Sequence, residues 1–86
     1  MEVIFIGKSE KDLQEWQKAG NTAVLKRIRK LIEEIQKKPF EGIGKPAPLK
    51  FNLAGKWSRR ITEKDRIVYE IEESVIKVYS LKGHYL

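Results

Sequence analysis

The chain has 86 residues, enough for one small domain with a core; 41% of them are apolar and 35% are charged. It has no cysteine and one histidine, which excludes disulfides, thiolate metal sites and multi-histidine metal centres. No apolar run is long enough to span a membrane, and residues 1–6 do not resemble a signal peptide. We therefore expect a single cytoplasmic domain over residues 1–86 that needs no metal or other cofactor.

The net charge of +6 comes from one part of the chain. Residues 37–66 hold nine basic and three acidic side chains, whereas the charges of the remaining residues cancel. From Gly42 to Arg60 there is no acid, and the basic residues there are Lys45, Lys50, Lys56, Arg59 and Arg60. Clustered positive charge suits a polyanion, so nucleic acid is the expected partner.

One strand and two helices are predicted before this basic segment. Residues 2–6 are apolar and rich in β-branched side chains, which favours a strand. Ser9 is the candidate N-cap of a first helix, and Asn21 or Thr22 begins a second one. The apolar residues of the second helix recur every three or four positions, which predicts an amphipathic helix, and Pro39 should end it. These apolar residues are Val24, Leu25, Ile28, Leu31, Ile32 and Ile35.

Three more strands are predicted at residues 56–62, 66–72 and 75–82. Short polar turns join them, so they should form an antiparallel meander. The order strand, helix, helix, strand, strand, strand predicts an α+β fold with both helices on one face of a small antiparallel sheet. The other face would stay partly open, and basic strand residues are expected to line it.

The segment before these strands contains two prolines, Pro46 and Pro48, which restrict its backbone. It would display Lys45, Ala47 and Lys50 on a stiff arm that a polyanion could contact. The alternative is a connector whose prolines only lower the entropy of the unfolded chain. Composition does not distinguish the two.

The adjacent Arg59 and Arg60 must point to opposite faces of a strand. One can reach the open face, and the alternative is that both form exposed ion pairs of little energetic value. Arg66 could face the same surface and complete a phosphate clamp. His84 and Tyr85 follow the last strand. A lone histidine is more often structural or exposed, but its place beside a basic sheet face favours an acid–base role.

Together these residues resemble the YoeB (Txe) family of bacterial mRNA interferase toxins, in the RelE/ParE superfamily. The match covers nearly the whole chain and is densest at residues 39–42, 44–46, 48–50, 52–53, 57–63, 66–69 and 84–85. The resemblance implies a RelE-like fold and a toxin of a type II toxin–antitoxin system that cleaves mRNA in the A site of the 70S ribosome. It also implies a YefM-like antitoxin, operator DNA binding only as a toxin–antitoxin complex, and a homodimer.

The chemistry that the resemblance implies needs no metal. A base removes the proton of a ribose 2′-hydroxyl, which attacks the adjacent phosphorus, and an acid protonates the departing 5′-oxygen. By its position in the motif, Arg66 would stabilise the phosphate and His84 would act as the acid or base. Tyr85 would orient or assist, and Lys50 and Arg60 would be supporting cations.

The chain departs from the family pattern at Ala47, where the family typically has a glutamate that serves as general base. Alanine cannot accept a proton, and three interpretations remain open. Ala47 is an introduced inactivating change, or a natural residue in a weak enzyme that uses His84 or water as base, or the mark of a member that has lost cleavage. The last interpretation makes the chain a non-catalytic RNA- or ribosome-binding module regulated by an antitoxin. Leu86 extends the chain one residue beyond the family's usual terminal tyrosine.

Overall fold

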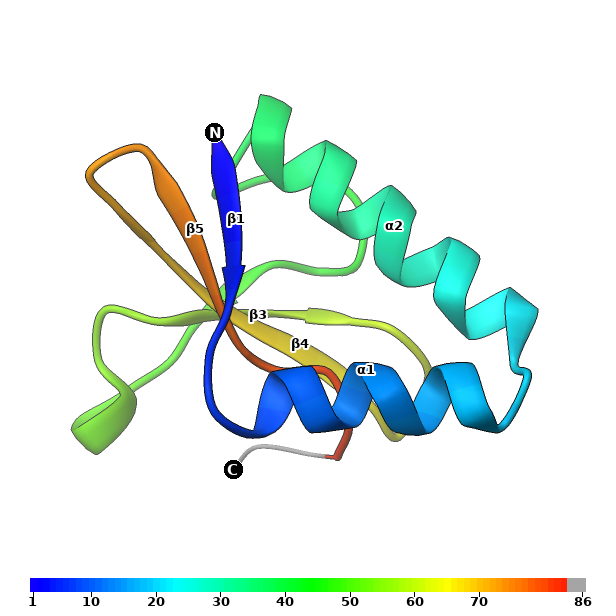
Figure 1. Cartoon of the computed structure of the whole chain (residues 1–86). Helices are drawn as coiled ribbons and strands as arrows, with labels where there is room; N and C mark the ends of the chain where they lie inside the picture. Colours follow the sequence, from blue (N-terminus) through cyan, green and yellow to red (C-terminus); the bar gives the residue numbers. More distant parts are fainter. Residues whose placement is uncertain (84–86) are drawn as a thin grey trace.

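A computed structural model describes residues 1–83, which form two α-helices, five strands and one short 3-10 helix (Figure 1). The elements are β1 (Glu2–Phe5), α1 (Lys8–Lys18), α2 (Thr22–Lys37), β2 (Ala47–Pro48), η1 (Phe51–Leu53), β3 (Trp57–Arg60), β4 (Arg66–Glu72) and β5 (Val75–Ser80). The predicted order of elements is confirmed. The additions are the two-residue strand β2 and the short helix η1, both inside the segment that was expected to be a loop.

The five strands form one sheet in the order β1-β5-β4-β3-β2. The antiparallel meander of β3, β4 and β5 is confirmed, but the sheet is mixed because β1 runs parallel to β5. The expectation of an entirely antiparallel sheet is therefore wrong at β1. The chain leaves β1 into α1, and the Ser9 hydroxyl in the first turn of that helix donates to the carbonyl of Val78 at 2.6 Å, which ties the end of β1 and the start of α1 to β5.

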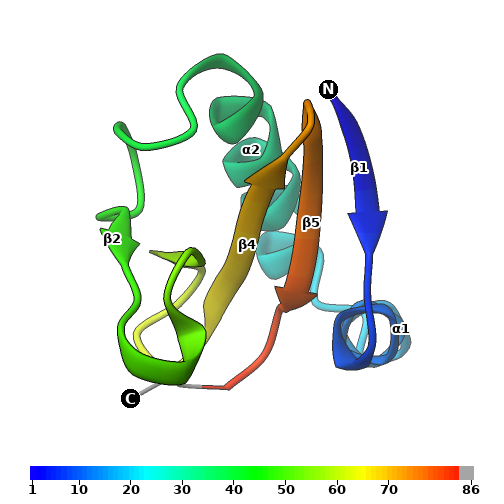
Figure 2. The same ribbon diagram turned by 90° about the vertical axis from the view of Figure 1, so that its left-hand side faces the viewer.

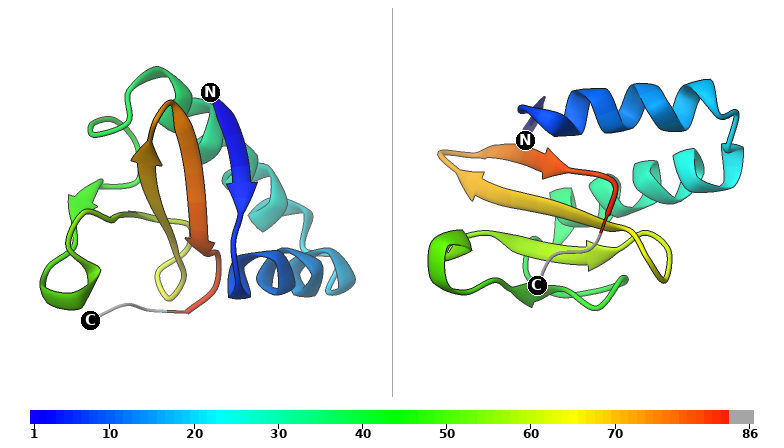
Figure 3. Two further views of the ribbon diagram at one scale, coloured as in Figure 1. Left: turned by 60° about the vertical axis from the view of Figure 1, so that its left-hand side comes forward. Right: turned by 90° about the horizontal axis from the view of Figure 1, so that it is seen from below.

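The two helices pack against one face of this sheet, as predicted. In Figure 2 and in the left view of Figure 3 the strands lie in front and α2 passes behind them. The buried side of α2 meets the inward side chains of β4 and β5 in a single core. Its fully buried apolar members are Leu31, Ile35, Ile67, Tyr69, Ile76, Val78 and Leu81. No helix within residues 1–83 is long and apolar enough to cross a membrane.

The two helix starts show one correct and one wrong cap prediction. Asn21 is the N-cap of α2, and its Oδ1 accepts a hydrogen bond from the backbone N–H of Val24 at 3.1 Å. Ser9 does not cap α1. The N-cap is Gly7, which has a φ of +59°, and Ser9 is fully buried inside the first turn. Its single hydroxyl hydrogen is shared by the carbonyl oxygens of Ile6 and Val78, so tertiary contact has displaced the capping role.

Candidate functional site

Strand pairing brings several of the predicted site residues to the sheet face that the helices do not cover. Ala47 lies opposite Ser58 across β2 and β3, and Arg60 lies opposite Arg66 across β3 and β4. Paired residues present their side chains on the same face of a sheet, and so do residues two apart on one strand, such as Ser58 and Arg60. Ala47, Arg60 and Arg66 therefore share one face, which we call the open face.

The guanidinium of Arg66 is anchored at one end. Nη1 donates to the carbonyl oxygens of Thr62, Glu63 and Asp65 at 2.8, 3.0 and 3.1 Å, all in the turn between β3 and β4. Within residues 1–83, no hydrogen bond uses its Nε or Nη2. The turn thus orients the guanidinium, and its remaining donors suit a phosphate oxygen.

The segment that follows β5 is held against α1. The backbone N–H of Leu81 donates to Oδ2 of the buried Asp12 at 3.0 Å, and Nε1 of Trp16 donates to the Leu81 carbonyl at 2.9 Å. Lys8 completes the cluster, since its Nζ contacts Asp12 Oδ2 at 2.5 Å and the Lys82 carbonyl at 2.8 Å. The sequence offers Asp12 only as a weak capping-box partner of Ser9 and does not single out Lys8, because the segment that both side chains contact is remote in sequence.

The same segment is also bonded to the turn that anchors Arg66. The N–H of Gly83 donates to Oδ1 of Asp65 at 2.9 Å, and the N–H of Arg66 donates to the Gly83 carbonyl at 3.0 Å. These two bonds fix Gly83 beside the first residue of β4. The next residues along the chain, His84 and Tyr85, are predicted site residues that lie outside the described part of the structure.

Arg59 is not part of a cationic surface. Its side chain is fully buried on the helix side of the sheet, where Nε donates to the Tyr69 hydroxyl at 3.0 Å. Nη1 donates to the Ile43 carbonyl at 3.1 Å, and Nη2 donates to the carbonyls of Lys38 and Glu41 at 2.6 and 2.9 Å. The assignment of Arg59 to RNA binding is therefore wrong, because its side chain is fully buried and four of its five N–H groups bond within the protein, mostly to the connection between α2 and β2.

The other predicted cations remain accessible. Lys45, Lys50 and Arg60 are exposed, and Lys56 is partly buried with its Nζ 4.6 Å from the centre of the Tyr79 ring. Most of the positive charge that the sequence concentrates in residues 42–60 is thus on the surface.

Carboxylates lie on the open face as well. Glu70 and Glu72 follow Arg66 along β4 at even spacing; Glu72 forms an ion pair with Lys77, and Oε1 of Glu70 accepts a hydrogen bond from the Tyr79 hydroxyl at 2.8 Å. Burial raises the pKa of Tyr79, and the bond to Glu70 raises it further. The phenol therefore stays neutral and keeps donating at physiological pH. Sequence reasoning missed this pair, because alternation along β4 marks Glu70 only as a solvated position.

The proline-containing arm is docked on β3. Ala47 is exposed, and Pro48 lies opposite Trp57 on the edge of the sheet, where a proline costs no ladder hydrogen bond. Backbone bonds secure the arm on either side, from Arg60 N to the Gly44 carbonyl at 2.7 Å and from Leu49 N to the Lys56 carbonyl at 2.9 Å. Position 47 is therefore held rigidly on the open face.

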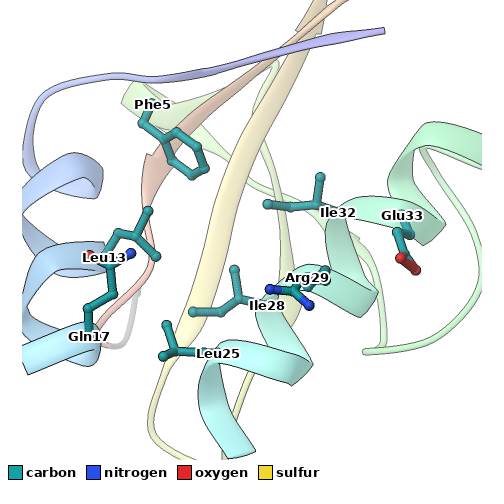
Figure 4. Close-up of a pocket in the computed structure, with 8 residues that line it drawn as sticks. All are labelled: Phe5, Leu13, Gln17, Leu25, Ile28, Arg29, Ile32 and Glu33. Carbon is teal, nitrogen blue, oxygen red and sulfur yellow. The ribbon is translucent and has the colours of Figure 1, made fainter. Parts of the chain in front are cut away.

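A separate hollow of about 370 Å³ lies on the helix side of the molecule (Figure 4). Apolar side chains from β1, α1 and α2 line it, and polar groups stand at its rim; they are Phe5, Leu13, Leu25, Ile28, Ile32, Gln17, Arg29 and Glu33. None of the predicted site residues contributes to it. Among residues 1–83, no group of three His, Asp or Glu side chains is arranged to hold a metal.

The two-helix layer, the mixed five-strand sheet and the open basic face define the RelE-like fold of small bacterial toxins. Within that class, the chain belongs to the YoeB family. Residues 5–85 match the family model of the YoeB-like toxin of bacterial type II toxin–antitoxin systems.

Individual relatives agree with this assignment. Toxin YoeB of Escherichia coli (strain K12) is 41% identical over 85 residues, which cover 99% of this chain and 100% of that protein. The structure of a YoeB/ParE toxin from Agrobacterium tumefaciens has a TM-score of 0.94 and 37% identity, with 99% of this chain and 100% of that chain covered. A heterotetrameric YoeB–YefM complex and a YoeB dimer, both from Staphylococcus aureus, each have a TM-score of 0.90 and 36% identity. Each covers 99% of this chain and 98% of the other.

Proposed function

We propose that this toxin cleaves mRNA in the A site of the ribosome, with an activity attenuated by Ala47. The observation that carries the proposal is the convergence on the open face. Cross-strand pairing sets Ala47, Arg60 and Arg66 on that face, and two hydrogen bonds hold Gly83 at the start of β4. The family to which the chain belongs supports the same site.

In the proposed reaction a ribose 2′-oxygen attacks the adjacent phosphorus and the bond from phosphorus to the 5′-oxygen breaks. The 2′-hydroxyl loses its proton to a base and the leaving 5′-oxygen receives one from His84, so the products are a 2′,3′-cyclic phosphate and a 5′-hydroxyl. Arg66 and Arg60 would bind the non-bridging oxygens, whose negative charge grows in the transition state. Tyr85 would orient the reacting groups.

The weak step is the removal of the 2′-proton. A positioned general base accelerates such a step by about 10² to 10⁴-fold, and a methyl group at position 47 supplies none of it. Binding and charge stabilisation by the arginines are independent of that base, so the rest of the site would keep its contribution.

The test is cleavage of mRNA by the purified protein in the presence of 70S ribosomes. Ala47→Glu should raise the rate by about 10²-fold or more, because a carboxylate at this site could accept the proton. Ala47→Gln is the matched control: it adds a side chain of the same shape that is not a base, and it should leave the rate low. An Ala47→Glu protein that cuts no mRNA on ribosomes would contradict the catalytic proposal.

We further propose a YefM-like antitoxin as partner and a homodimer as a form of the free toxin. The Staphylococcus aureus YoeB–YefM complex and YoeB dimer, which align over 99% of this chain, support both. The exposed cations of the open face suit an acidic antitoxin segment. Operator DNA would be bound only by the toxin–antitoxin complex, and the ribosomal target implies action in the cytoplasm.

Ala47 also favours a second candidate, a toxin that binds RNA or ribosomes without cutting. In that case ribosome binding would persist and fall steeply with added salt, because phosphate contacts release counterions. Ala47→Glu would remain inactive and His84→Ala would not change the phenotype. Measuring binding and cleavage on the same variants separates the two candidates.

A further inference from the structure

Phe51 is the most exposed large apolar side chain among residues 1–83, with 91% of its surface accessible. It is also held in the left-handed backbone region, with a φ of +58°, which is unfavourable for any residue that carries a Cβ. An aromatic ring that is both exposed and held in a strained conformation gains nothing from packing. Strain of this kind persists where the surrounding structure imposes it, often at binding sites.

Other aromatic rings near the arm are engaged. Phe40 is half exposed but packs against Trp57 in a tilted arrangement with ring centres 4.9 Å apart. Tyr79 packs under Lys56 and donates to Glu70. Phe51 has no such aromatic neighbour within residues 1–83, so its face is available.

The loop that carries Phe51 is ordered by its own backbone. Leu53 N donates to the Lys50 carbonyl at 3.1 Å, and Ala54 N donates to the Phe51 carbonyl at 3.0 Å. In Figures 1 and 3 this loop projects from the sheet, away from both helices. A shallow hollow of about 220 Å³ lies beside the ring, lined by Pro48, Leu49, Lys50, Phe51 and Leu53. The ring is thus presented at the edge of a preformed, mostly apolar hollow.

A cation stands beside the ring in sequence. Lys50 is exposed, and residues 42–60 contain no acid. The carboxylate of Glu70 reaches the far end of the loop, at Gly55, and is bonded to the Tyr79 hydroxyl. An aromatic face beside cations that follow a phosphate backbone is the arrangement by which proteins bind single-stranded nucleic acid. We propose that Phe51 stacks on a nucleobase of single-stranded RNA while Lys50 contacts the neighbouring phosphate. This inference rests on the proposed RNA target and adds a base-binding position outside the residues that the family resemblance assigns.

The alternative occupant of the same ring is a protein partner such as the antitoxin. A protein anchor is expected to sit at the centre of an apolar patch ringed by polar groups. The Phe51 hollow instead adjoins lysine and lies on a narrow projecting loop, which favours a strand of RNA.

The test uses the full chain and a short single-stranded RNA that carries one 2-aminopurine, whose fluorescence falls when it stacks. Phe51→Ala should weaken binding by about 5- to 100-fold, the range for one base–aromatic stack, and abolish the quenching. Phe51→Tyr and Phe51→Trp should retain both, whereas Phe51→Leu should retain neither. Asn52→Ala, an exposed change in the same 3-10 turn, is the matched control and should bind normally.

Salt dependence separates the two roles. Lys50→Gln should reduce the slope of log affinity against log salt by about 0.7, the value for one phosphate of a single strand, while Phe51→Ala should leave the slope unchanged. The inference is overturned if the protein without substitutions does not bind the RNA, if Phe51→Ala binds it normally, or if Phe51→Leu binds it as well as the protein with Phe51. It is also overturned if Phe51→Ala weakens only the complex with the antitoxin.

The outcome for Phe51 can be told from the outcome for the catalytic proposal. If the Ala47→Glu protein cleaves mRNA on ribosomes and the Ala47→Glu, Phe51→Ala double variant does so with the same KM, stacking is excluded and catalysis stands. If Ala47→Glu is inactive but the RNA is bound with quenching that depends on Phe51, the catalytic proposal fails and the base-binding position stands.

Discussion

Nε of Arg59 donates to the hydroxyl of Tyr69 at 3.0 Å, and that hydroxyl donates in turn to the carbonyl of Pro39 at 2.7 Å. Both side chains are fully buried. The pair joins two neighbouring strands to the segment that follows α2, and through it to the arm that carries Ala47. A buried polar network of this kind stabilises the fold only while every member is bonded.

Replacing the buried arginine should therefore cost far more stability than replacing its neighbour. Arg59→Ala leaves the Tyr69 hydroxyl and three carbonyls without their donor, and each buried group left unsatisfied costs about 1 to 3 kcal/mol, so we expect a loss of about 3 kcal/mol or more in the free energy of unfolding. Arg60→Ala, at an exposed position, should change it by less than about 0.5 kcal/mol. Urea unfolding of the two variants provides the comparison, and equal losses would contradict the burial of Arg59.

Tyr69 should make stability fall at alkaline pH. Burial raises the pKa of its hydroxyl, and the opposing effect of Arg59 is smaller. The folded pKa lies above the unfolded value of about 10. The stability that the neutral Tyr69 hydroxyl contributes is therefore fully present below about pH 10 and is lost as the pH rises through the folded pKa. Tyr69→Phe should cost about 1 to 3 kcal/mol at neutral pH and lose less stability than the unchanged chain above about pH 10. The measurement is the free energy of unfolding of both proteins as a function of pH. If the two curves run parallel above about pH 10, the pKa of Tyr69 does not differ between the folded and unfolded states, and the prediction is wrong.

Gly44 should tolerate no side chain. Its φ is +84°, and a Cβ would lie 2.9 Å from Cδ2 of the buried Leu31 and 3.1 Å from Cβ of Arg59. Gly44→Ala therefore combines backbone strain with overpacking and should destabilise the protein by about 2 to 4 kcal/mol. Gly20→Ala has strain alone, since its φ is +66° and a Cβ there would meet nothing within 4 Å, and should cost about 1 kcal/mol. Thermal unfolding in which both variants melt together would refute the close packing at Gly44.

Asp65 should affect the proposed catalysis by holding the segment around Gly83 in place beside Arg66. Its Oδ1 accepts from Gly83 N and its Oδ2 accepts from the Thr62 hydroxyl, so Asp65→Ala releases the segment next to Arg66. In the Ala47→Glu background we expect the cleavage rate to fall about 10-fold or more, because small misplacements of reacting groups are costly. Glu63→Ala, an exposed change in the same turn, is the control. Ribosome binding should stay constant in both variants; a fall in binding that accounts for the lost rate would argue against a positioning role.

Much of the fold could be predicted because its elements have strong periodic signals. The helix from Thr22 follows a three-four apolar spacing, and β4 begins and ends at the predicted residues. The role of Ser9 could not be predicted, because its hydroxyl donates to the carbonyl of Val78 in β5, which is remote in sequence. The two-residue β2 is too short to leave a pattern of its own.

The site was less predictable than the fold. Motif positions identified Ala47, Arg60 and Arg66, and strand pairing sets all three on one face. The sequence could not separate Arg59 from Arg60, because two adjacent arginines look alike until the partners of each are known. Phe51 was missed for the opposite reason: an aromatic residue is expected in the core, and only the structure shows it exposed.

The parallel pairing of β1 with β5 has a consequence for synthesis of the chain. Val3 pairs with Ile76, so β1 must wait for β5, which is made much later, before it has a neighbour in the sheet. β5 lies between β1 and β4 and supplies Ile76 and Val78 to the core, which cannot close without them. Contacts so distant in sequence form late. The toxin domain would thus acquire its folded shape only after β5 has been made.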